Sequence, residues 1–192
     1  MDRFGRSLVY KVLALTGLRK GELASITVGQ VWLDGRQPYL ELKAKDEKAG
    51  RGAQIPLRPD LADEIKSFLR KKLMQFASNN ESTKLLKLPL NTPLFYVPKD
   101  FIKIFNRDLI AAGISKCDER GRTLDIHALR HTFGTHLSKA GVAPRIAQAA
   151  MRHSSIDLTM NIYTDPTLLD VAGAINALPK FTASQLKSAK IA

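Results

Sequence analysis

Apolar residues recur every three or four positions in several stretches of the chain, the spacing that gathers them on one face of an α-helix. In the first stretch, 7–16, Leu8, Val12 and Leu15 share a face, and Gly17 follows as a typical helix terminator. Similar patterns, helped by proline at helix starts, predict further helices over 59–77, 99–112, 125–140, 145–152, 155–163 and 168–178.

Between residues 30 and 57 the apolar spacing changes from the helical period to alternation, which is typical of half-buried strands. Three short strands are predicted over 30–34, 38–45 and 53–57, separated by a turn at 34–36 and a glycine-bearing loop. The sequence therefore predicts a mixed α+β fold that is mostly helical, with a small three-stranded antiparallel sheet on one edge.

Four basic residues lie in and beside the loop between the second and third strands: Lys43, Lys45, Lys48 and Arg51. Such a hairpin could reach into a nucleic-acid groove, with these side chains and His131 as contacts to DNA. Alternatively, lysines on an exposed strand edge protect it from pairing with another chain. The pattern leaves both interpretations open.

The chain is strongly basic, with 30 Lys and Arg against 18 Asp and Glu among 192 residues and a formal charge of +12. An excess of this size favours a polyanionic partner, most often nucleic acid. The length suits one domain, which we place at 1–178, followed by a small basic tail at 179–192.

Neither a signal peptide nor a membrane-spanning apolar run is present in the sequence, so we expect the cell interior and no membrane partner. Cys117 is the single cysteine. An internal disulfide and a Cys-based zinc site are therefore excluded.

The candidate chemistry lies in the C-terminal third. His127 and Arg130 are one helical turn apart and can face one ligand, and His153 and Tyr163 follow. Fixed positive charge, neutral hydrogen-bond donors and a hydroxyl nucleophile are the groups needed to break a phosphodiester without a metal. Leu129, Phe133 and Leu137 are expected to form the buried face of the same helix.

A second candidate group follows Gly17. Arg19 and Glu22 are three residues apart, so they could pair and fix the direction of the guanidinium. Taken alone, the spacing fits a solvated surface pair better, since such pairs are common and weak.

A zinc site is the sharpest alternative for the histidines, because His127 and His131 have the i, i+4 spacing of zinc-binding helices. Ala128 stands where such motifs carry glutamate, and the interposed Arg130 would repel a cation. We therefore expect no metal at this site.

Several motifs together resemble a known family. TGLRKGEL, HALRHTFGTHL, His153 and NIYTD occur in the order and spacing of the catalytic domain of tyrosine recombinases, the phage integrase family, over residues 5–178. The resemblance implies that family's catalytic-domain fold. It also implies a helical core-binding domain ahead of this one, so we expect the chain to be a fragment of a longer protein.

Carried over position by position, the resemblance assigns a role to each candidate. Arg19 corresponds to the first catalytic arginine and Glu22 to its supporting acid. Lys48 corresponds to the hairpin lysine, because the family's lysine lies about eight residues before the proline that closes the next strand, here Pro56. The remaining catalytic positions correspond to His127, Arg130, His153 and the nucleophile Tyr163.

The resemblance implies a site-specific recombinase or integrase of a mobile genetic element, which cuts and rejoins double-stranded DNA through a 3′-phosphotyrosine without metal, ATP or other cofactor. It further implies a homotetramer on DNA, a free monomer being compatible with it, and a bacterial or phage protein at the nucleoid. The segment 167–178 could dock on a neighbouring protomer or fold back in cis. A catalytically silent DNA-binding regulator and a type IB topoisomerase-like enzyme remain as alternatives.

Overall fold

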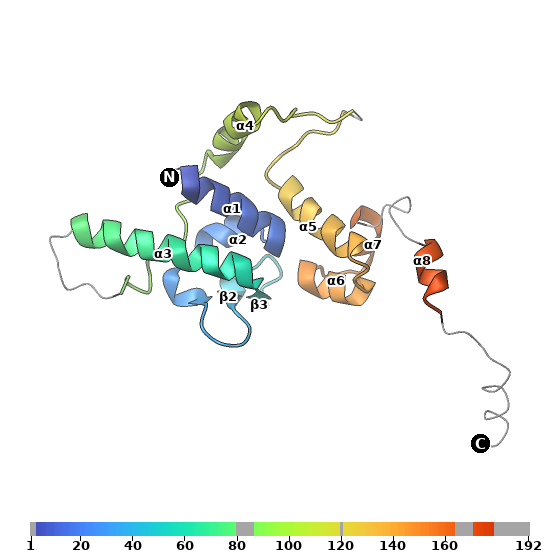
Figure 1. Ribbon diagram of the computed structural model, residues 1–192, viewed down its shortest axis with the longest axis horizontal. Helices are drawn as coiled ribbons and strands as arrows, with labels where there is room; N and C mark the ends of the chain where they lie inside the picture. Colours follow the sequence, from blue (N-terminus) through green and yellow to red (C-terminus); the bar gives the residue numbers. More distant parts are fainter. Residues whose placement is uncertain (1–2, 80–86, 120, 164–170, 179–192) are drawn as a thin grey trace, which may run out of the picture.

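The computed structural model describes residues 3–79, 87–119, 121–163 and 171–178 of the chain (Figure 1). Its helices are α1 (Arg3–Thr16), α2 (Lys20–Ser25), α3 (Pro59–Asn79), α4 (Phe101–Ala111), α5 (Ala128–Lys139), α6 (Pro144–Met151), α7 (Asp157–Tyr163) and α8 (Val171–Asn176). The strands are β1 (Val31–Trp32), β2 (Tyr39–Leu42) and β3 (Ala53–Pro56), with 3₁₀ turns at Val28–Gln30 and Ala44–Asp46. The predicted α+β class, mostly helical, is confirmed.

Helix α1 forms the centre of the core. Its residues Leu8, Val9, Val12 and Leu13 are all buried, and the helix packs against both α3 and α5. The apolar spacing predicted this buried face, although the helix begins at Arg3 rather than at residue 7.

The three strands form one antiparallel sheet in the order β1-β2-β3. Leu40 of β2 pairs with Ile55 of β3, and both side chains lie in the core. The strands are shorter than predicted, because β2 ends at Leu42 and the backbone then enters the 3₁₀ turn at Ala44–Asp46. Consequently Lys43 and Lys45 lie in the connecting loop instead of on a strand.

Helix α4 is attached to α1 by one aromatic residue. The ring of Tyr10 contacts Phe101 and Phe105, with ring centroids 5.6 and 5.5 Å away. Its hydroxyl donates a 2.7 Å hydrogen bond to Asp108. Burial and this carboxylate raise the pKa of Tyr10, so its hydroxyl stays protonated as a packing group.

Helix α5 begins later than predicted, and its buried face is different. The backbone turns at Asp125–His127 before the helix starts, and an oxygen of the Asp125 carboxylate accepts a 3.0 Å hydrogen bond from the Ala128 amide. The buried positions are Arg130 and Gly134, whereas the expected residues Leu129, Phe133 and Leu137 are only half-buried. The prediction was wrong because an arginine, which periodicity assigns to the surface, faces inward here.

Helices α6 and α7 pack against α5 and against each other (Figure 1). The tail 179–192 and residues 164–170, including Leu168 and Leu169 of the predicted last helix, lie outside the described residues. Ile175 and Leu178 are exposed. In the part of the chain that the structure covers, no helix is long and apolar enough to cross a membrane.

The α1–α2 turn generates a stability prediction. Gly17 has φ +61°, and a Cβ placed there would lie 2.4 Å from Cδ1 of Phe133 on α5. We expect Gly17→Ala to lower the free energy of unfolding by about 2 to 4 kcal/mol, from left-handed backbone strain plus overpacking. Urea denaturation measures this loss.

Gly113→Ala is the matched control, because Gly113 has φ +67° with nothing within 4 Å of the added Cβ. It should lose only the backbone contribution, about 1 kcal/mol. Equal losses for the two variants would contradict tight packing of the turn against α5.

Candidate active site

The α1–α2 turn carries the first pair of candidate residues. Arg19 is the N-cap of α2, and its backbone amide and Nη1 donate hydrogen bonds of 2.9 and 2.6 Å to the Glu22 carboxylate. Burial alone would raise the pKa of Glu22, which is 3% exposed, but these bonds and the charge of Arg152 lower it overall. Glu22 is thus an ionised, buried partner that fixes the guanidinium, rather than part of a solvated surface pair.

Arg130 is almost completely buried, at 1% exposed. Its Nη1 donates to the carbonyl of Gly17 and its Nη2 to the carbonyl of Met151. One guanidinium therefore joins α5 to the α1–α2 turn and to the last residue of α6. This connection, which spans more than a hundred residues of sequence, places Arg130 beside Arg19.

His127 and His131 mark the start of α5, with His127 as the N-cap. Their rings meet edge to face with centroids 5.2 Å apart. Partial desolvation and the charge of Arg130 lower both pKa values, and the charges of His131 and Arg19 lower that of His127 further. Both imidazoles are therefore neutral near pH 7, and each neutral ring can donate one hydrogen bond and accept one.

His153 follows the end of α6, which closes in a Schellman motif. The amide of His153 donates 3.1 Å to the carbonyl of Gln148, and the Arg152 amide donates 3.0 Å to Ala149. The His153 ring lies 3.0 Å through Nδ1 from the hydroxyl of Thr159. Burial and the charges of Arg130, Arg19, Arg152 and His127 lower its pKa to about 4.

The fold brings four of the predicted residues close enough for their charges to influence the pKa values of the histidines. Arg19, Arg130, His127 and His153 come from three separate parts of the chain and affect one another electrostatically. Tyr163 ends α7, which packs against both α5 and α6, but its side chain lies outside what the structure describes.

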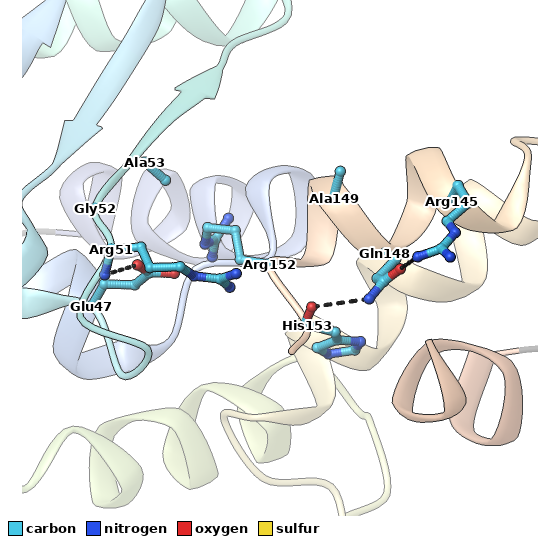
Figure 2. Close-up of a pocket in the computed structure, with 9 residues that line it drawn as sticks. All are labelled: Glu47, Arg51, Gly52, Ala53, Arg145, Gln148, Ala149, Arg152 and His153. Carbon is cyan, nitrogen blue, oxygen red and sulfur yellow. Dashed lines mark hydrogen bonds between the residues drawn. The ribbon is translucent and has the colours of Figure 1, made fainter. Parts of the chain in front are cut away.

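The predicted basic hairpin faces α6 across a pocket of about 510 Å³ (Figure 2). Arg51 lines this pocket from the β2–β3 loop, and Arg152 and His153 line it from the end of α6. Lys43, Lys45, Lys48 and Arg51 are all exposed. The Lys48 side chain makes no hydrogen bond or ion pair with the described part of the protein, so it is free to move.

The sequence model of the phage integrase family matches residues 4–168. The chain belongs to the phage integrase family.

Relatives within the phage integrase family are named tyrosine recombinases. XerA of Pyrococcus furiosus is 26% identical over 174 residues, covering 91% of this chain and 54% of that protein. XerD of Yersinia pestis is 31% identical over 154 residues, covering 80% and 47%. The chain therefore spans about half the length of the curated relatives it matches.

The fold of the phage integrase family is also seen in solved structures. The pre-cleavage complex of the XerH site-specific recombinase with its difH substrate has a TM-score of 0.61 and 22% identity, covering 93% of this chain and 49% of that one. The predicted family and its catalytic-domain fold are confirmed.

Two buried charges in this phage integrase domain were missed by sequence reasoning. Glu47, in the β2–β3 loop, is 6% exposed and accepts a 2.9 Å hydrogen bond from the Arg51 amide. Arg152 is the last residue of the helix predicted over 145–152, for which no role was expected, and its side chain is only 7% exposed. One signal was available for Arg152: no glycine follows the predicted helix, so another residue had to close it.

The depressed pKa of His153 predicts a pH dependence. An unfolded chain binds the proton at about pH 6.5, before the folded protein does at about 4. The folded state should therefore lose stability as the pH falls from about 6.5 towards 4, and keep the full contribution of His153 above that window.

NMR titration of the histidine Cε1 protons would give the pKa of His153, and urea denaturation at several pH values would give the stability. His153→Gln should show a shallower loss between pH 6.5 and 4. A titration midpoint of His153 at or above 6.5 would contradict the electrostatic description of the site.

Proposed function

We propose that this protein is the catalytic domain of a tyrosine site-specific recombinase, which cuts and rejoins DNA through a 3′-phosphotyrosine. The observation that carries the proposal is the convergence of two arginines, Arg19 and Arg130, with two neutral imidazoles, His127 and His153. Membership of the phage integrase family and the relatives named tyrosine recombinases support it.

The two arginines can stabilise the negative charge that develops on the phosphate oxygens. Attack on a phosphodiester concentrates negative charge on two non-bridging oxygens, and guanidiniums can hold both without losing a proton. Arg19 is fixed by Glu22, and Arg130 by two carbonyls, so neither needs to reorganise during the reaction. A site of this kind stabilises the transition state by preorganised charge.

His153 and His127 can supply a hydrogen bond and accept a proton, respectively. Neutral His153 keeps one ring nitrogen near Thr159 and can present the other to a phosphate oxygen. Neutral His127 has a lone pair that can accept the phenol proton from Tyr163. Since both pKa values lie below the ordinary range, both roles are available at neutral pH.

The covalent step involves Tyr163 and the hairpin lysine. The phenol oxygen of Tyr163 attacks phosphorus as its proton passes to His127, the bond from phosphorus to the 5′ oxygen breaks, and Lys48 protonates that oxygen. Attack by a new 5′ hydroxyl reverses these transfers and joins two strands. Because the phosphotyrosine keeps the bond energy, the cycle as proposed consumes neither ATP nor a metal.

Double-stranded DNA is the proposed partner, in line with the formal charge of +12 and with the DNA complex of XerH. Affinity should fall steeply as salt rises, because binding releases counterions. We propose a homotetramer on DNA that exchanges strands in pairs, acting at the nucleoid of a bacterial or phage-infected cell.

Covalent capture tests the proposal. The protein is incubated in EDTA with a pool of nicked duplexes of randomised sequence, whose short cleaved end diffuses away and traps the adduct. We expect wild-type protein to form a covalent DNA adduct on a denaturing gel and Tyr163→Phe to form none. Sequencing the captured DNA would identify the preferred site.

Fluorescence anisotropy on the same duplexes is the control, and Tyr163→Phe should bind DNA as wild type does. DNA binding without any adduct from wild type would contradict the proposal in favour of a binding-only regulator. An adduct that forms equally in both proteins would exclude Tyr163 as the nucleophile.

The general acid can be tested separately, by changing the leaving group. Lys48→Ala should slow adduct formation by about 100-fold on ordinary DNA, because the 5′ oxygen leaves unprotonated. On DNA with sulfur at the bridging 5′ position, Lys48→Ala should react at the wild-type rate, because a thiolate leaves without a proton.

Lys43→Ala and Lys45→Ala are matched controls, since both residues are exposed lysines of the same loop. For neither variant should the loss of rate on ordinary DNA be restored by sulfur at the bridging 5′ position. Sulfur rescue of Lys45→Ala in place of Lys48→Ala would move the acid role to Lys45.

A further inference from the structure

Arg152 occupies a backbone position that disfavours an arginine. It has φ 55° and ψ 41°, the left-handed conformation at the end of α6, where glycine is the usual residue. It is the one non-glycine residue with positive φ among the residues the structure describes. Its buried Nε also has no hydrogen-bond partner there. Backbone preference therefore does not explain an arginine here, and its Nε gains no hydrogen bond from burial among the described residues.

Apart from a 3.3 Å hydrogen bond from Nη1 to the Ala150 carbonyl of α6, the hydrogen bonds of the Arg152 guanidinium go to the α1–α2 turn and the start of α2. Nη2 donates 3.0 Å to the Gly17 carbonyl and 3.2 Å to Glu22 Oε2, and Nη1 donates 3.4 Å to the Thr16 carbonyl. Arg152 thus connects the last turn of α6, immediately before His153, to the segment that carries Arg19.

Two of these acceptors are shared with the proposed phosphate-binding arginines. The Glu22 carboxylate that accepts from Arg152 also accepts from Arg19, and the Gly17 carbonyl that accepts from Arg152 also accepts from Arg130. Arg152 is therefore linked to each of the other two guanidiniums through one shared hydrogen-bond acceptor.

We propose that Arg152 is a positioning residue for DNA cleavage, which holds the Glu22 carboxylate and the Gly17 carbonyl in place so that Arg19 and Arg130 face the phosphate. This inference rests on the proposed function. By sharing the carboxylate, Arg152 adds to the two hydrogen bonds of Arg19 that lower the pKa of Glu22, and it leaves more of the positive charge of Arg19 available to the substrate. By holding the turn, it fixes the distance between Arg19 and His153.

Arg152→Gly is the decisive variant, because glycine suits the left-handed backbone and should fold well. We expect the single-turnover rate of adduct formation at saturating DNA to fall by about 100-fold. The dissociation constant for DNA should change by less than about 3-fold, since the guanidinium is buried. Arg152→Lys keeps one charge and the same strain, and should recover part of the rate.

Two readouts separate positioning from a merely structural role. The pKa of the Glu22 carboxylate, measured by NMR, should rise in Arg152→Gly, and the cleavage rate should then fall on the acid side at a higher pH than in wild type. In a Glu22→Gln background, removing Arg152 should slow the reaction much less, because the shared carboxylate is already neutral.

Arg58→Gln is the charge-matched control, since Arg58 is an exposed arginine paired with Asp60. Arg58→Gln should leave both the rate of adduct formation and the pKa of Glu22 unchanged. An Arg152→Gly rate within 3-fold of wild type, an unchanged Glu22 pKa, or additive effects with Glu22→Gln would overturn the proposal. Lack of an adduct from wild type would instead refute the proposed function, and the Glu22 titration would still test the link to Arg152.

Discussion

The carbonyl oxygen of Gly17 is the point on which the site depends. This oxygen accepts hydrogen bonds from both Arg130 of α5 and Arg152 at the end of α6. Gly17 itself lies two residues before Arg19 in the chain. Gly17 holds this orientation with φ +61°, in close contact with Phe133. A single backbone group therefore links the α1–α2 turn to both α5 and the end of α6.

Gathering two buried guanidiniums, Arg130 and Arg152, beside the half-buried Arg19 is unfavourable for folding unless the charges are compensated. Glu22 compensates Arg19 and Arg152, and backbone carbonyls solvate Arg130. The cluster keeps a net positive charge, which adds to the effect of burial in lowering the pKa values of His127 and His153. The same excess of positive charge that costs stability in the free protein is what would bind a phosphate that becomes more negative during the reaction.

Sequence reasoning succeeded where the pattern is local. The apolar spacing predicted α1, α3 and α4, alternation predicted the sheet, and the spacing of Arg19 and Glu22 predicted their ion pair. It failed where distant segments meet. The buried state of Arg130 and Arg152 depends on acceptors at Gly17, Thr16 and Met151, and no helical period indicates such partners. The predicted strand lengths were also wrong, because a 3₁₀ turn replaces the expected end of β2.

Glu47 shows how the hairpin and the arginine cluster are connected. It is buried in the β2–β3 loop next to the exposed Lys48, and its charge raises the pKa of Arg152, opposing the larger effect of burial. The anchored residue and the free lysine are thus neighbours on one loop. In the proposed reaction, Glu47 would stay buried near Arg152, held by the Arg51 amide, while the exposed Lys48 moves towards the leaving oxygen. The proposed reaction needs rigidity where negative charge is stabilised and mobility where a proton is delivered.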